Sequence, residues 1–168
     1  MKYPSWLNAI TLALVLSGCA NPPAGSSDAT LLHRIDTVMR QASPTMTVGL
    51  KLSATEVKTG DAITTEVSSG TAGFVYLFQM GTEGKTLNLI FPNAMDGANY
   101  IAAGTSLGLP RPGWRMSARG PAGVGHILAV VTDKPLDLLA LQSATRQGQL
   151  DVRSPFGAAM ATLRETAP

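Results

Sequence analysis

The sequence contains little cysteine, histidine or charge, and each shortage excludes a class of protein. One Cys and two His are too few for a Cys-rich zinc site, an intramolecular disulfide or an iron–sulfur cluster. Charged residues make up 14% of the chain and the formal net charge is +2, which excludes the basic surface of a nucleic-acid-binding protein and an acidic disordered tail. We therefore expect no metal, no cofactor and no nucleic-acid partner.

Long apolar segments are also scarce. The run WLNAITLALVL, from Trp6 to Leu16, follows Lys2 near the amino terminus. It is too short for a membrane span of about 20 residues, but it is typical of the hydrophobic core of a signal peptide. No later stretch approaches the length of a membrane span.

The apolar run ends in Leu16-Ser17-Gly18-Cys19, which resembles the lipobox of bacterial lipoproteins. The resemblance implies that the signal peptidase recognises Leu16, Ser17 and Gly18, and that the thiol of Cys19 is lipidated. Ala20 stands where an Asp would signal retention in the inner membrane, so the resemblance implies the periplasmic face of the outer membrane. The alternative is an ordinary secretory signal in which Cys19 is incidental.

This interpretation divides the chain into a signal peptide (1–18), a lipidated tether (19–27) and a single globular domain (28–168). The domain opens with apolar residues at helical spacing, which predict an amphipathic helix over 28–41. The period then changes from 3.6 to 2 and predicts strands, of which 74–80 and 125–133 are apolar on both faces and should be central. The strands are predicted over 45–53, 63–67, 74–80, 86–91, 100–102 and 125–133.

Two helices are predicted towards the carboxyl terminus, over 136–143 and after Ser154-Pro155. The second aligns Phe156, Ala159, Met160 and Leu163 at i, i+3, i+4 and i+7. The segment 93–123 is rich in Gly and Pro and is predicted to be irregular. The fold class is therefore mainly β: an antiparallel sandwich or open barrel of about six or seven strands, with short flanking helices at both ends.

Residues 50–137 carry an ordered set of short motifs and resemble the domain-of-unknown-function family numbered 4384. The resemblance implies a β-rich domain of bacterial envelope proteins, with some members in secretion-related or signalling gene settings, and it supplies no catalytic residue. The motifs are Lys58–Asp61, Gly73–Phe78, Gly84–Asn93, Asn99–Gly104, Leu109-Pro110, Gly120–Gly123 and Ile127–Val131.

A candidate surface for a partner or ligand lies in the irregular segment 93–123. It carries Tyr100, Arg111, Trp114 and Arg115, residue types that are enriched at the anchor points of interfaces. The alternative is that Trp114 caps the end of the core and that the arginines form a solvated rim.

These features predict a non-enzymatic outer-membrane lipoprotein that binds or helps to assemble another envelope component. The family resemblance implies that the protein could serve as an accessory to a secretion system, whose components would be its partners. The alternative function is a small-molecule or cell-wall glycan-binding module, with an aromatic pocket near Tyr100 and Trp114. A wall-remodelling enzyme is the least supported hypothesis, because no motif selects a catalytic residue.

We predict that replacing Cys19 by Ser leaves the protein without lipid. Several acyl chains, at about 0.8 kcal/mol per buried CH₂, exceed what stable membrane anchoring needs. The variant should therefore lack the mass of the acyl chains, as followed by intact-mass measurement of the protein from each cell fraction. A Cys19→Ser protein whose intact mass still includes the acyl chains would contradict the lipoprotein interpretation.

Overall fold

The structure is a computed structural model that describes residues 26–168, with side chains from residue 31 onward. The predicted signal peptide and the predicted lipidation site Cys19 lie outside the described residues. Within that range no helix is long and apolar enough to cross a membrane.

Within residues 26–168 the chain forms nine strands and two helices, and the strands belong to two sheets. The smaller sheet has the order β1-β3-β7, and the larger has the order β2-β9-β8-β4-β5, with the short β6 pairing with β4 beside β5. The elements are α1 (Ser26–Arg40), β1 (Val48–Leu52), β2 (Glu56–Lys58), β3 (Thr65–Ser69), β4 (Gly73–Met80), β5 (Leu87–Phe91), β6 (Tyr100–Ile101), β7 (Thr105–Leu109), β8 (Gly123–Thr132), α2 (Leu138–Arg146) and β9 (Phe156–Thr166).

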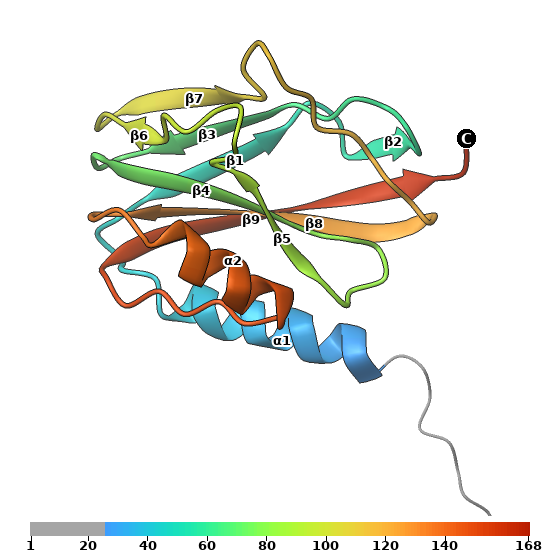
Figure 1. The fold of residues 1–168 in the computed structure, drawn as a ribbon, viewed down its shortest axis with the longest axis horizontal. Coiled ribbons are helices and arrows are strands. Elements are labelled where there is room, and N and C mark those ends of the chain that lie inside the picture. The colour runs from blue at the N-terminus through green and yellow to red at the C-terminus, as the bar shows by residue number, and fades with distance from the viewer. Residues whose placement is uncertain (1–25) are drawn as a thin grey trace, which may run out of the picture.

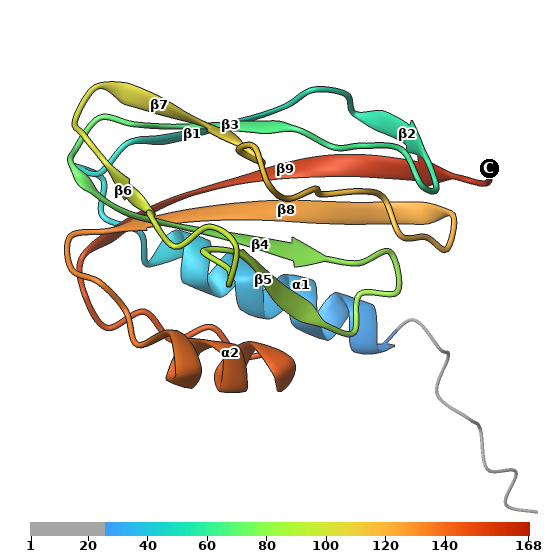
Figure 2. The same cartoon turned by 45° about the horizontal axis from the view of Figure 1, so that its top comes forward.

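The elements stack in three layers. The three-stranded sheet covers one face of the six-stranded sheet, and α1 and α2 cover the other (Figures 1 and 2). The prediction of a mainly β, sandwich-like domain is confirmed. The order of the strands leaves both sheets open, so the open sandwich describes the fold and the barrel does not.

Two hydrophobic cores separate the layers, and β4 and β8 contribute to both. Val75 and Leu77 of β4 point into the core between the sheets, whereas Tyr76 and Phe78 point into the core beneath the helices. β8 alternates in the same way from Ile127 to Val131, and all of these side chains are buried. Successive side chains of a strand face opposite sides, so a strand between two cores must be apolar throughout. The predicted central position of both strands is confirmed.

The prediction of a helix after Ser154-Pro155 is wrong, because Phe156–Thr166 is the strand β9. β9 pairs antiparallel with β8 over ten residues. Phe156 and Met160 pack beneath the helices, and Leu163 lies in the core between the sheets. Because this strand also has two covered faces, its apolar residues do not alternate visibly, and their spacing matches a helix by coincidence.

Other departures from the prediction concern pairing between distant segments. β2 pairs parallel with β9, so the larger sheet is mixed rather than antiparallel. The segment 93–123 contains the predicted short strand β6, and it also contains β7, which pairs antiparallel with β3 where the sequence predicts irregular structure. The helix prediction over 28–41 is confirmed by α1, and the one over 136–143 by α2, which begins and ends a few residues later.

Gly157 marks the closest approach between β9 and the chain leading into β1. A Cβ at this position would overlap the carbonyl oxygen of Met46 and lie 2.6 Å from a methyl group of Val48. Backbone atoms cannot move aside without disturbing the packing of β1 on β9. Glycine at position 157 is therefore a packing requirement of the sandwich.

We predict that Gly157→Ala lowers the free energy of unfolding by about 1–3 kcal/mol through overpacking. Gly108→Ala in β7 is the matched control, because a Cβ added there would meet nothing within 4 Å and losing a glycine restricts the unfolded chain. Urea unfolding at pH 7 measures the free energy of unfolding of wild type and both variants. Equal effects at the two positions would contradict the close approach at Gly157.

Candidate functional site

A tight turn follows β5 and is held by one asparagine side chain. Asn93 Oδ1 accepts the backbone N–H groups of Met95 and Asp96 at 2.9 and 3.0 Å, and Asn93 Nδ2 donates to the carbonyl oxygen of Ile90 at 3.0 Å. This is the way in which a short amide side chain imitates a backbone turn. The turn is therefore fixed at both ends, to β5 and to Asp96.

Asp96 is the centre of a hydrogen-bond network that joins three segments of the loop. Its Oδ2 accepts from Arg111 Nε at 2.8 Å and from Trp114 Nε1 at 3.0 Å, and its Oδ1 accepts from Arg111 Nη2. Arg111 Nη2 also donates to the carbonyl oxygen of Ala98 at 2.7 Å. A planar guanidinium that binds both oxygens of one carboxylate fixes orientation as well as distance.

The network is largely shielded from water, and this affects its charges. The side chain of Asp96 is 10% exposed and that of Arg111 is 33% exposed. The hydrogen bonds from Arg111 lower the pKa of Asp96, with a smaller contribution from Trp114, although burial opposes them. The same pair raises the pKa of Arg111. Both groups are therefore held in their charged forms.

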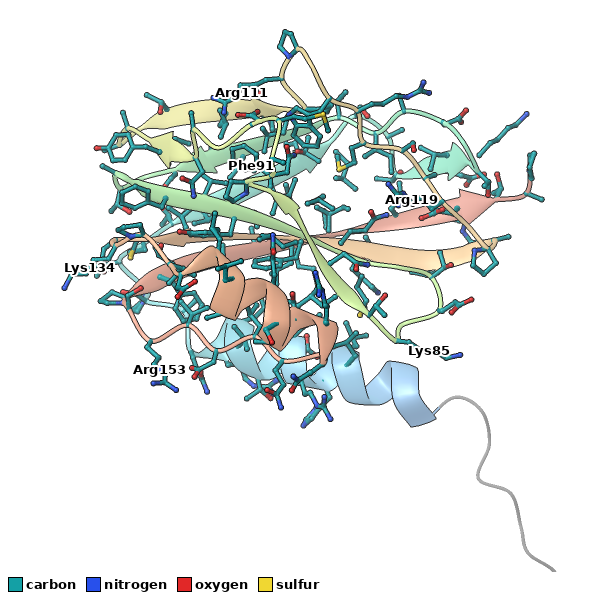
Figure 3. The ribbon with its side chains drawn as sticks, in the orientation of Figure 1. Lys85, Phe91, Arg111, Arg119, Lys134 and Arg153 are labelled. Atoms are coloured by element: carbon teal, nitrogen blue, oxygen red, sulfur yellow. The ribbon has the colours of Figure 1, made fainter. Side chains whose placement is uncertain are left out.

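Aromatic packing seats this network on the core between the sheets. The rings of Trp114 and Phe91 stack with centroids 6.3 Å apart and planes inclined by 3°, and the guanidinium carbon of Arg111 lies 5.5 Å from the centroid of Phe91. Figure 3 shows Arg111 and Phe91 above the end of β5. Phe91 itself is fully buried. The segment that lacks regular structure around residues 110–116 is thus pinned to the sandwich.

The turn presents one large apolar side chain to solvent. Met95 is 71% exposed, although the backbone on both sides of it is held by Asn93 and Asp96. An exposed, flexible thioether on a rigid backbone is well suited to contact another protein. The turn 93–96 together with Arg111 and Trp114 forms the candidate functional site, which we call the Asp96 loop.

The four residues predicted as one surface do not lie together. Arg111 and Trp114 meet at Asp96, on the side of the six-stranded sheet that faces the smaller sheet. Tyr100 is 60% exposed and lies edge-on to Phe74, which packs on the helix-facing core, so it belongs to the opposite face. Arg115 is exposed and donates to the carbonyl oxygen of Gly60 at 3.4 Å.

Sequence reasoning missed Asp96, Phe91 and Met95 as members of this site. A single Asp in a loop with several arginines does not reveal which arginine it binds. The only local signal is Asn93 after Pro92, which indicates a turn. The pairing of Asp96 with Arg111, fifteen residues away, depends on the course of the chain through β6 and β7.

Two further observations concern side chains that could bind a metal ion or exchange a proton. Within residues 26–168, no group of three or more His, Cys, Asp or Glu side chains could hold a metal ion. His126 lies within β8, with Nδ1 3.2 Å from Thr162 Oγ1. Burial lowers the pKa of His126, although the charge of Asp36 opposes the shift.

Comparison with protein families gives a match to part of the chain. Residues 56–135 match the family model described as a domain of unknown function (DUF4384). The match runs from β2 to just past β8 and includes the whole Asp96 loop. No curated protein matches the chain.

We predict that Asp96→Asn lowers the free energy of unfolding at pH 7 by about 1–3 kcal/mol, because it leaves Arg111 without its counter-charge. The pKa of Asp96 is depressed in the folded state, so its contribution is complete above the ordinary carboxyl pKa of 3.8 and disappears as the pH falls through the folded pKa. The difference between wild type and variant should therefore shrink below about pH 3.8.

Urea unfolding at a series of pH values measures this difference. Asp151→Asn is the matched control, because Asp151 also pairs with an arginine, Arg153, but both side chains are exposed and such pairs contribute little. A stability difference for Asp96→Asn that is independent of pH would contradict the role of its charge.

Proposed function

We propose that this chain, which carries a DUF4384-like domain over residues 56–135, is a lipid-anchored lipoprotein on the periplasmic face of the outer membrane; the lipobox-like residues Leu16–Cys19 support the anchor. Its role is to bind or assemble another envelope protein, without catalysis of its own, as an accessory to a larger machine such as a secretion system. The observation that carries this proposal is the rigid Asp96 loop with Met95 exposed at its tip.

The rigidity of the loop favours binding to a folded partner. A flexible loop loses conformational freedom on association, and this loss subtracts from the affinity. Here Asn93, Arg111 and Trp114 fix the loop before any partner arrives. A partner that covers Met95 would therefore gain the burial of an apolar side chain, about 1.5–3 kcal/mol, with little ordering of the backbone.

The predicted lipid at Cys19 would assist such binding. An anchor confines the domain to a layer beside the membrane, and this raises its effective concentration towards partners in the same envelope. Modest contacts through one loop can then be sufficient. The residues between Cys19 and α1 would act as the tether that lets the loop reach its partner.

The alternative function, an aromatic pocket for a small molecule or glycan near Tyr100 and Trp114, finds no support in the geometry. The two rings lie on opposite faces of the six-stranded sheet, packed on Phe74 and Phe91 respectively. They do not line one pocket. A binding site for a small ligand would have to be built from other residues.

We predict that the full-length lipoprotein, purified from detergent-solubilised envelopes, carries a stoichiometric envelope protein that Met95→Lys loses. Lysine at this position places a charge in the contact, so the bound partner should fall at least tenfold. The measurement is quantitative mass spectrometry of the purified complexes, with Cys19→Ser in parallel to show the effect of the anchor.

Leu139→Lys is the matched control, because Leu139 of α2 is 80% exposed and lies on the helical layer, away from the loop. It should retain the partner. A protein that purifies alone, or one that loses its partner equally with Met95→Lys and Leu139→Lys, would overturn the proposed role of the Asp96 loop.

A further inference from the structure

A polar cavity of about 170 Å³ lies at the end of β5 opposite to the Asp96 loop. It opens between the β4–β5 turn and the segment that leads into β8. Figure 3 shows Arg119 at this corner, beside β9, and Lys85 at the tip of the turn, pointing away. The side chains that define the cavity are those of Gln79, Thr82, Glu83, Asn88, Arg119 and Glu165.

The side chain of Glu165 in this cavity is largely buried, and one of its two carboxylate oxygens accepts a hydrogen bond from the protein. Glu165 of β9 is 3% exposed, and its Oε2 accepts the backbone N–H of Gly120 at 2.7 Å. Among residues 31–168 no side chain donates a hydrogen bond to its Oε1, and no Lys, Arg or His forms an ion pair with Glu165. Buried carboxylates in proteins ordinarily have a cationic or hydrogen-bonding partner for each oxygen, and among residues 31–168 Glu165 has no cationic partner.

The walls of the cavity are held in place, so the cavity is part of the fold. Thr82 Oγ1 donates to the carbonyl oxygen of Pro121 at 2.8 Å and ties the β4–β5 turn to the segment before β8. Gly120 adopts a φ of +65°, a conformation that L side chains rarely take. This conformation aims its N–H at Glu165. The carboxylate is thus oriented by the backbone.

The charges around the cavity select a cationic ligand. Glu165 brings a buried carboxylate and Glu83 an exposed one, and Gln79, Asn88 and Thr82 add oxygen atoms that can accept hydrogen bonds. Arg119 brings one positive charge, but it is exposed and forms no ion pair with Glu165. Because no three acidic or His side chains come together among the described residues, the donor set is poor for a metal ion.

We infer that this cavity binds an ammonium group carried on an aliphatic stem, such as the side chain of a lysine in a partner or a small primary amine. The ammonium group donates to Glu165 Oε1, and the neutral oxygens of Gln79 and Asn88 accept its remaining N–H bonds. The volume corresponds to about six water molecules at roughly 30 Å³ each, which is sufficient for an ammonium group and several methylenes. This site is independent of the Asp96 loop and does not rest on the function proposed for that loop.

A titration of the ¹⁵N-labelled full-length chain in detergent micelles tests the site. The probe is Nα-acetyl-lysine amide, and the control compound is Nα-acetyl-norleucine amide, which has an apolar stem but no charge. The Gly120 amide, which is bonded to Glu165, should shift saturably with the lysine compound and not with the norleucine compound. No shift with either, or equal shifts with both, would overturn the inference.

Variants separate the buried carboxylate from general surface charge. Glu165→Gln keeps the shape of the side chain and an oxygen that accepts from the Gly120 N–H. It should lower the affinity for Nα-acetyl-lysine amide at least tenfold. Glu66→Gln, on the exposed outer side of β3, is the matched control and should leave the affinity unchanged. Equal affinity of Glu165→Gln and wild type would overturn the inference.

A second variant keeps the test decisive if Glu165→Gln fails to fold. Arg119→Ala changes an exposed side chain and removes the competing positive charge, so it should tighten binding of the lysine compound several-fold. An unchanged or weaker affinity would contradict the inference. Calcium chloride serves as a further probe: a Glu165-dependent shift of Gly120 at lower concentrations of Ca²⁺ than of the amine would assign the site to a metal instead.

Discussion

The structure depends on a six-stranded sheet that is covered on both faces. β4, β8 and β9 lie at its centre, and most of their side chains meet either the smaller sheet or the helices; Val124, Thr162 and Arg164 near one end are exposed. A strand in this position can contain almost no charged residue along most of its length. This explains the continuous apolar runs of β4 and β8 and the run of small residues in β9, where Gly157 lets the chain before β1 approach.

The same constraint places the polar chemistry at the ends of the sheet. The Asp96 loop continues from one end of β5, and the Glu165 cavity lies at the other end. Each uses a backbone turn to orient a carboxylate: Asn93 holds the turn that carries Asp96, and Gly120 binds Glu165. They differ in one respect. Asp96 has its counter-charge in Arg111, whereas Glu165 has no cationic partner among residues 31–168.

The matched stretch 56–135 does not close the fold by itself. β9 lies outside it but separates β2 from β8 in the larger sheet, and β1 lies outside it but pairs with β3. Glu165 also belongs to β9. The family motifs around Gly84 and Gly120 supply part of the lining of the cavity, and the carboxyl-terminal strand supplies Glu165. Any ligand specificity at this corner would therefore vary with a segment that the matched stretch does not include.

The sequence alone determined the mainly β class, α1, and the central positions of β4 and β8, because these follow from local periodicity and from apolar runs. It also indicated Arg111 and Trp114 as candidate residues for a binding surface. Only the tertiary structure decided that 156–166 is a strand, because small residues between two cores carry no clear period. Likewise, the bond between Asp96 and Arg111, the separation of Tyr100 from Trp114 and the burial of Glu165 result from pairing between distant segments, whose register no local pattern encodes.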